Sequence, residues 1–283
     1  MSKFGWAYIG CGGISRTTAS ELVQTDDNKI VAAWNRTKEK AEGFVKDFGG
    51  TVYDTAEEAI IADGVEGVYV NVNGDQYAYY TKLAIDLGKP VLCEKPFTFN
   101  EKDTKELLDY AAEKGVYVSE AMWTWHNDTA LGGALMDLGV YNVRYAYELF
   151  GKPDRIDCEA DMHEVDHSED ITFHYPGFKA TMHVSMAEEG GHFFEVTGTK
   201  GSITVPKFHM AKEAVLKTDD GEERFETDEL LYGKQFSNVA EEIRSGRKEG
   251  EKISAHSTVE VMSLLDECRR QMGLVYPQEK TGN

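Results

Sequence analysis

The chain has 283 residues, of which 41% are hydrophobic, and a formal net charge of −20 at pH 7. This length is sufficient for two domains with sizeable cores, and the negative charge argues against nucleic acid and anionic membrane surfaces as partners. The four cysteines form no C-x-x-C pair, and no apolar stretch approaches membrane-spanning length. We therefore expect a cytoplasmic protein without a disulfide framework or a metal site.

Strand-like and helix-like segments alternate over the first 120 residues. Short apolar runs predict strands at residues 4–9, 29–34, 65–70, 90–93 and 116–118. Helical spacing predicts helices at residues 13–24, 38–48, 76–87 and 101–114. Such alternation is typical of βαβ units, which form a doubly wound parallel sheet with helices on both faces.

The pattern changes after about residue 151. Short runs bounded by turn residues predict strands at residues 155–163, 171–175, 179–186, 193–197 and 202–205, and two helices follow at 232–245 and 256–272. Consecutive strands with tight turns favour an antiparallel sheet. We therefore expect two α/β domains, residues 1–122 with the parallel sheet and residues 123–283 with an open, mostly antiparallel sheet.

A glycine loop follows the first predicted strand and opens the first predicted helix. It reads Gly10-Cys11-Gly12-Gly13-Ile14-Ser15. This context matches a dinucleotide-binding fingerprint, in which glycines allow a tight turn and a close approach of the backbone to the pyrophosphate. A plain glycine turn is the alternative. We expect Gly10, Gly12, Gly13 and Ile14 to contact the cofactor.

The end of the second predicted strand bears on the choice between NAD and NADP. An acidic residue there would bind the ribose 2′-hydroxyl group of NAD. The sequence instead has Asn35-Arg36-Thr37, with no carboxylate before Glu39. Arg36 is suited to a 2′-phosphate or to stacking on adenine, although it would equally suit an exposed helix start. These residues favour NADP(H), with NAD(H) as the alternative.

Three residues are candidates for proton transfer at an alcohol. Lys95 follows a predicted strand and so belongs at the carboxyl edge of the parallel sheet, where open α/β sheets bind ligands. Asp137 and Tyr141 are four residues apart, which places them on one face of a helix. An ammonium near a phenol favours the phenolate, so Lys95 would activate Tyr141, while Asp137 would orient the lysine or the substrate. Taken singly, each has an ordinary structural explanation.

Several stretches resemble the glucose–fructose oxidoreductase / inositol dehydrogenase / MocA family, and most closely its dimeric dihydrodiol dehydrogenase branch. The resembling stretches are residues 10–15, 93–97, 120–123, 132–141, 198–203 and 273–277. The resemblance implies a Rossmann domain followed by an α/β domain with an open antiparallel sheet. It also implies NAD(P)-dependent oxidation or reduction at a sugar, polyol or diol, and a homo-oligomer. Lys95 and Tyr141 would be the catalytic pair, and Asn73 and Glu94 would lie near the cofactor.

One stretch departs from that family. Relatives insert a helix and a strand before the Gly132–Gly133 pair, whereas only residues 127–131 occupy that place after Trp123, Trp125 and His126. We therefore expect a shortened second domain with either a break in the chain or one strand fewer. The shortening also keeps open a second hypothesis, a dinucleotide-binding regulator without turnover, and a third, a fragment with impaired folding.

A histidine-rich and acidic stretch at residues 163–174 is open to two interpretations. It has three histidines, His163, His167 and His174, and four carboxylates, which are potential metal ligands. Its position between predicted strands favours a solvated polar loop instead, and we assign no metal site to it.

Overall fold

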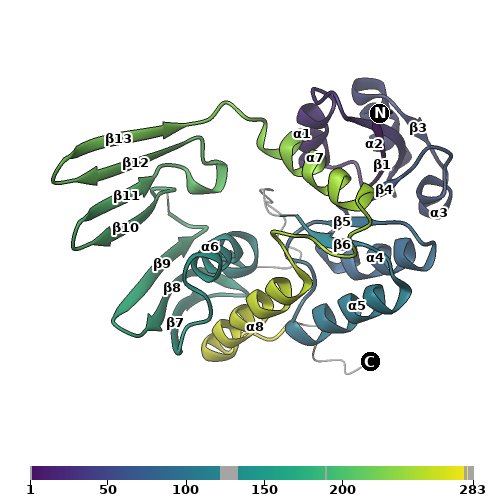
Figure 1. The fold of residues 1–283 in the computed structure, drawn as a ribbon. Coiled ribbons are helices and arrows are strands. Elements are labelled where there is room, and N and C mark those ends of the chain that lie inside the picture. Colours follow the sequence, from purple (N-terminus) through teal and green to yellow (C-terminus); the bar gives the residue numbers. More distant parts are fainter. Residues whose placement is uncertain (1, 122–132, 189, 277–278, 280–283) are drawn as a thin grey trace.

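A six-stranded parallel sheet forms the first part of the molecule (Figure 1). The computed structural model describes residues 2–121, 133–188, 190–276 and 279. The strands are β1 (Phe4–Ile9), β2 (Asn28–Trp34), β3 (Thr51–Val52), β4 (Gly67–Val70), β5 (Val91–Cys93) and β6 (Val118–Glu120). Their order is β3-β2-β1-β4-β5-β6, so the winding direction reverses between β1 and β4. Open α/β sheets bind ligands at this switch point.

Helices cover both faces of the parallel sheet, as the alternating pattern predicts. One face packs against α1 (Gly13–Leu22), α2 (Lys38–Phe48) and α7 (Leu231–Arg244). The other packs against α3 (Ala56–Ile60), α4 (Tyr77–Asp86) and α5 (Glu101–Lys114). Helix α7 comes from the C-terminal half of the sequence, and its Phe236 contacts the rings of Trp6, Tyr8 and Tyr69 in this core.

The second part of the molecule is built on antiparallel strands. Three of them, β7 (Arg155–Met162), β8 (Asp166–Tyr175) and β9 (Phe178–Ser185), form one sheet. Four others, β10 (Phe194–Gly198), β11 (Gly201–Val205), β12 (Glu213–Thr218) and β13 (Gly221–Glu226), form another. The antiparallel pairing confirms the expectation. A single open sheet was expected, however, and the strands are divided between two because β9 and β10 do not pair.

Helices join the three-stranded sheet to the first part. A π-helical turn, η3 (Leu135–Gly139), continues into α6 (Val140–Phe150), and α8 (Ala255–Met272) packs against both α6 and β7. Together with β8 they enclose a third core, which includes Val143, Phe173 and Leu265. Helix α8 also contacts α5, so it connects the two parts of the molecule.

Some expectations fall on residues 122–132, which lie outside the described residues. These are the shortened stretch at 127–131 and the aromatic cluster of Trp123, Trp125 and His126. Within the described ranges, no helix has the length and apolar composition that a bilayer span requires. The same ranges contain no group of three or more His, Cys, Asp or Glu side chains arranged to hold a metal ion.

Candidate active site

The glycine loop lies at the switch point of the parallel sheet. Gly10 follows β1 with a φ of +101°, a conformation that residues with a side chain rarely adopt. A Cβ atom on Gly10 would lie 1.9 Å from the carbonyl oxygen of Asn71, the residue that follows β4. Glycine is therefore required where the two strands meet.

The loop that follows has the properties of a dinucleotide cradle. Cβ atoms added to Gly12 or Gly13 would meet nothing within 4 Å, so the backbone at the start of α1 is open to a ligand. No acidic residue occupies the first turn of α1, which leaves the positive end of the helix dipole free for a pyrophosphate. Asn71 adds a buried side-chain Nδ2 that has no partner among the described residues. An unpaired buried donor is costly, and a bound cofactor offers it an acceptor.

The residues after β2 play different roles from one another. Asn35 accepts a hydrogen bond from the backbone N–H of Cys11 (3.0 Å) and donates one to the carbonyl of Thr37 (2.9 Å), so it fixes the glycine loop to the end of β2. Arg36 is exposed, and no described carboxylate lies within ion-pair distance of it. Its guanidinium group is therefore available to an anion.

Lys95, Asp137 and Tyr141 are brought together at the carboxyl edge of the sheet. Lys95 follows β5, and its Nζ donates to the carbonyl oxygen of Asp137 (2.6 Å) and to Oδ1 of the same residue (3.3 Å). The ammonium group lies over the ring of Tyr141, 4.6 Å from the ring centroid. The π-helical turn that carries Asp137 leads directly into α6, which carries Tyr141, so one helical segment presents both residues to the lysine. Such turns are frequent at functional sites.

Burial sets the electrostatics of Lys95. Its side chain is 3% exposed, and this desolvation lowers the pKa of its ammonium group. The carboxylates of Asp137, Glu94 and Glu120 act in the opposite direction, in that order of size. The lysine is thus a buried cation whose charge is balanced by the carboxylates around it, an arrangement that is common at catalytic sites.

Three expected cofactor contacts are placed differently from the rest. Glu94 is fully buried and accepts a hydrogen bond from the hydroxyl of Tyr69, so its side chain supports Lys95 from within the core instead of facing a ligand. Asn73 is exposed at the start of a short 3₁₀ turn after β4, and Ile14 is half-buried at the start of α1.

The start of the helical segment that carries Asp137 and Tyr141 is held by a carboxylate whose role the sequence did not reveal. Asp166 Oδ2 accepts a hydrogen bond from the backbone N–H of Leu135 (2.7 Å). A Cβ atom on Gly133, whose φ is +123°, would lie 1.7 Å from Oδ1 of the same carboxylate. The expectation of a solvated loop is wrong for Asp166 and Glu169, because β8 begins at Asp166 and directs both side chains into the third core.

Comparison with known proteins identifies the family of this chain. Residues 4–122 match the model of an oxidoreductase family with an NAD-binding Rossmann fold, and residues 87–204 match the GFO/IDH/MocA C-terminal domain. The chain belongs to the GFO/IDH/MocA family. This confirms the family inferred from the sequence motifs.

Relatives of this GFO/IDH/MocA protein match it over nearly its whole length. Mouse trans-1,2-dihydrobenzene-1,2-diol dehydrogenase is 25% identical over 97% of this chain and 98% of its own. The NADP⁺-dependent scyllo-inositol 2-dehydrogenase of Bacillus subtilis is also 25% identical, over 97% and 99%. A 3-ketoreductase from Actinomadura kijaniata, solved with TDP-benzene and NADP, has the same fold with a TM-score of 0.83 at 20% identity, covering 96% of this chain and 98% of its own.

The alignment with the mouse enzyme extends over 335 residues, whereas the present chain has 283. The relative therefore carries residues without a counterpart here, as a shortened chain requires.

Proposed function

We propose that this protein is an NADP(H)-dependent oxidoreductase that transfers hydride between the cofactor and a secondary alcohol or carbonyl carbon of a sugar, polyol or diol. The observation that carries the proposal is the Lys95 ammonium, held by Asp137 over the ring of Tyr141. This group lies at the same sheet edge as the glycine loop, because the strands that end there are parallel. The named relatives, which act on a dihydrobenzenediol and on scyllo-inositol, support the substrate class.

In the oxidative direction, Tyr141 is the general base for the substrate hydroxyl. The positive charge of Lys95 favours the phenolate form of Tyr141 and polarises the substrate oxygen. Asp137 holds the lysine through its carbonyl and carboxylate oxygens, so the ammonium group needs little reorganisation as charge develops. NADP⁺, when bound, accepts the hydride. In the reductive direction, Tyr141 returns the proton to the carbonyl oxygen.

The cofactor preference is supported by two features of the glycine loop and its surroundings. The open backbone at Gly12 and Gly13 and the orphan donor of Asn71 suit a pyrophosphate-linked dinucleotide. Arg36 and Thr37, both exposed after β2, suit a 2′-phosphate. Solved relatives with bound NADP support the same choice.

A turnover assay separates this function from that of a non-catalytic dinucleotide-binding regulator. We expect NADP(H)-linked turnover with at least one member of a panel of inositols, sugars and cyclic diols. Tyr141→Phe should lower kcat by about 10² to 10⁴ while leaving cofactor affinity nearly unchanged. Lys95→Ala should cost at least as much, and the two losses should not add, because the residues act as a unit. Cofactor binding without turnover on the entire panel would favour the regulator, and wild-type rates in Tyr141→Phe would contradict the assignment.

Self-association and a cytoplasmic location remain predictions. Exposed apolar side chains on the antiparallel strands, such as Ile203 (43% exposed) and Phe225 (51%), are the kind of surface that a second copy of the chain would cover. Sedimentation of the wild type and of Ile203→Glu would test this. A monomer at all accessible concentrations would rule out the homo-oligomer.

A further inference from the structure

Glu120 connects the two segments that carry the candidate catalytic residues. It ends β6 and is 5% exposed. One carboxylate oxygen accepts from the backbone N–H of Phe97 (3.0 Å), two residues after Lys95. The other pairs with Arg144, three residues after Tyr141 on α6. A single buried carboxylate therefore joins the lysine loop to the tyrosine helix.

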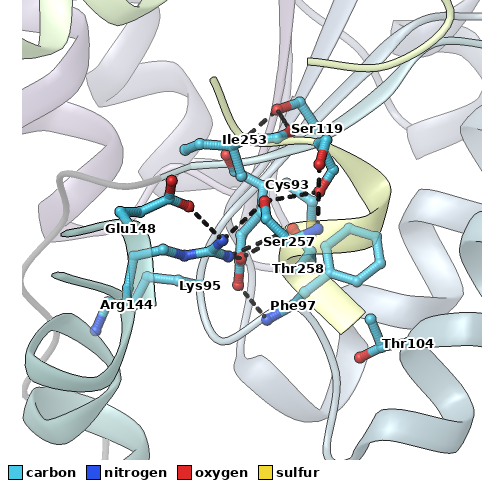
Figure 2. Close-up of polar contacts among 12 residues, drawn as sticks. Cys93, Lys95, Phe97, Thr104, Ser119, Arg144, Glu148, Ile253, Ser257 and Thr258 are labelled. Carbon is cyan, nitrogen blue, oxygen red and sulfur yellow. Dashed lines mark hydrogen bonds and ion pairs between the residues drawn. The ribbon is translucent and has the colours of Figure 1, made fainter. Parts of the chain in front are cut away.

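Arg144 extends this connection to α8. Its Nη1 donates to Ser257 Oγ (3.1 Å) and its Nη2 reaches Thr258 Oγ1 (3.4 Å), both in the first turn of α8. Figure 2 shows Arg144 reaching from α6 toward Ser257 and Thr258, with Phe97 beyond them. The arginine is 2% exposed, so this network is desolvated and its bonds are stronger than at a surface.

We infer that Glu120 and Arg144 are positioning residues that set the distance between the Lys95 ammonium and the ring of Tyr141. The inference rests on the proposed function, since it assigns these residues to the same site. Neither side chain is assigned to contact the substrate. They act through the backbone of the lysine loop and through one turn of α6, which is a rigid link between Arg144 and Tyr141.

The geometry of arginine is what this role requires. Its planar guanidinium group directs several donors at fixed angles, here toward the carboxylates of Glu120 and Glu148 and toward two hydroxyls, and a lysine presents only a point charge. Arg144→Lys therefore keeps the charge opposite Glu120 but loses the fixed angles. The other charged groups that face Lys95 are Asp137 from η3 and Glu94 from its own loop, and the substitution leaves both in place.

The test compares Arg144→Lys with Arg269→Lys. Arg269 is a matched control because it is also buried (5% exposed) and pairs with two carboxylates, Asp266 and Glu279. These carboxylates bond Glu101 and Asn100, at the far end of the loop from Lys95 and Phe97. The ionisation of Tyr141 is followed by NMR of ¹³C-labelled tyrosine, with the resonance assigned by its loss in Tyr141→Phe. If the Lys95 ammonium group lay about 1.5 Å further from the ring of Tyr141, the titration midpoint of Tyr141 would rise by roughly half a pH unit at an effective dielectric of about 20.

We expect Arg144→Lys to show this upward shift and to lower kcat by about 10- to 100-fold, with KM for NADP(H) changed less than about twofold. Arg269→Lys should lower the melting temperature without moving the Tyr141 midpoint or kcat. If Arg144→Lys also lost only thermal stability, the pair would be structural and the inference would be overturned.

The test remains conclusive even if Arg144→Lys does not fold or the wild type shows no turnover. Should Arg144→Lys fail to fold, Glu120→Asp keeps the negative charge that acts on Lys95 but is one methylene too short to reach both Phe97 and Arg144, and the same midpoint shift is expected. Should the wild type show no turnover, the proposed function fails, but the NMR midpoints of wild type and variant still decide whether the pair positions Lys95 against Tyr141.

Discussion

Glu169 makes the stability of this protein depend on pH in a direction opposite to that of most carboxylates. Its side chain is 1% exposed on the inner face of β8, beside Asp166. Both Glu169 carboxyl oxygens and Asp166 Oδ1 have no donor among the described residues. A proton on Glu169 supplies that donor. Burial, and then the neighbouring Asp166, raise the pKa of Glu169 from 4.5 to about 10.

The sign follows from proton binding. Between pH 4.5 and about 10 the native state keeps a proton on Glu169 that the unfolded chain releases, so the free energy of unfolding falls as pH rises. Each pH unit well inside this window costs about 1.4 kcal/mol. From pH 6 to pH 8 the contribution of Glu169 is therefore a loss of about 3 kcal/mol, a large part of the stability of a typical protein.

Glu169→Gln should remove this dependence. The amide cannot ionise, and its NH₂ group still donates to Asp166. Urea unfolding at pH 6, 7 and 8 should show the difference in free energy of unfolding between variant and wild type growing by about 3 kcal/mol across the range. Glu159→Gln, at an exposed glutamate on the adjacent β7, serves as the control and should show a constant difference. A constant difference for Glu169→Gln as well would refute the buried proton.

Four further substitutions test the cofactor cradle. Gly10→Ala should destabilise the fold by more than about 1 kcal/mol in urea unfolding, because its φ is positive and its Cβ would meet the Asn71 carbonyl, whereas Gly12→Ala should fold normally and weaken only NADP(H) binding. Asn71→Ala should weaken NADP(H) binding by about 3- to 10-fold in calorimetric titration, the value of one neutral hydrogen bond, and wild-type affinity would show that the orphan donor has another use. Arg36→Ala should reduce the preference for NADP(H) over NAD(H) by about 10- to 100-fold, and tighter binding of NAD(H) by the wild type would refute the preference itself.

Sequence patterns predicted the elements whose side chains alternate between core and solvent. The expected bounds of β1, α2 and α5 agree with the structure at both ends. The β12–β13 hairpin shows the limit. The expected strands end at residue 205, and β13 escapes the pattern because all six of its residues are exposed and carry no apolar alternation. Pairing with a neighbouring strand, which a local pattern does not show, makes β13 a strand.

The candidate site likewise contains residues that the sequence predicted and residues that it did not. Lys95, Asp137 and Tyr141 were found because each belongs to a local motif, and the structure brings them together. Asn71 and Arg144 were missed because their surroundings are made by distant segments. The Asn71 carbonyl lies against Gly10, at the point where β4 meets the end of β1. Arg144 pairs with a carboxylate 24 residues earlier in the chain. Contacts of this kind follow from topology, and one sequence does not display them.

The shorter length of the chain has different consequences for the proposed proton transfer and for the choice of substrate. The contacts of Lys95 with Asp137 and Tyr141 come from the loop after β5 and from η3 and α6, all within the described ranges. The proposed proton-transfer group is therefore formed by residues that this chain has. Substrate choice depends instead on the walls of the pocket, which differ among members of one fold. We accordingly expect the substitutions at Lys95 and Tyr141 to reduce turnover by similar factors on every substrate that the protein accepts. A loss confined to one substrate would place these residues in recognition and not in proton transfer.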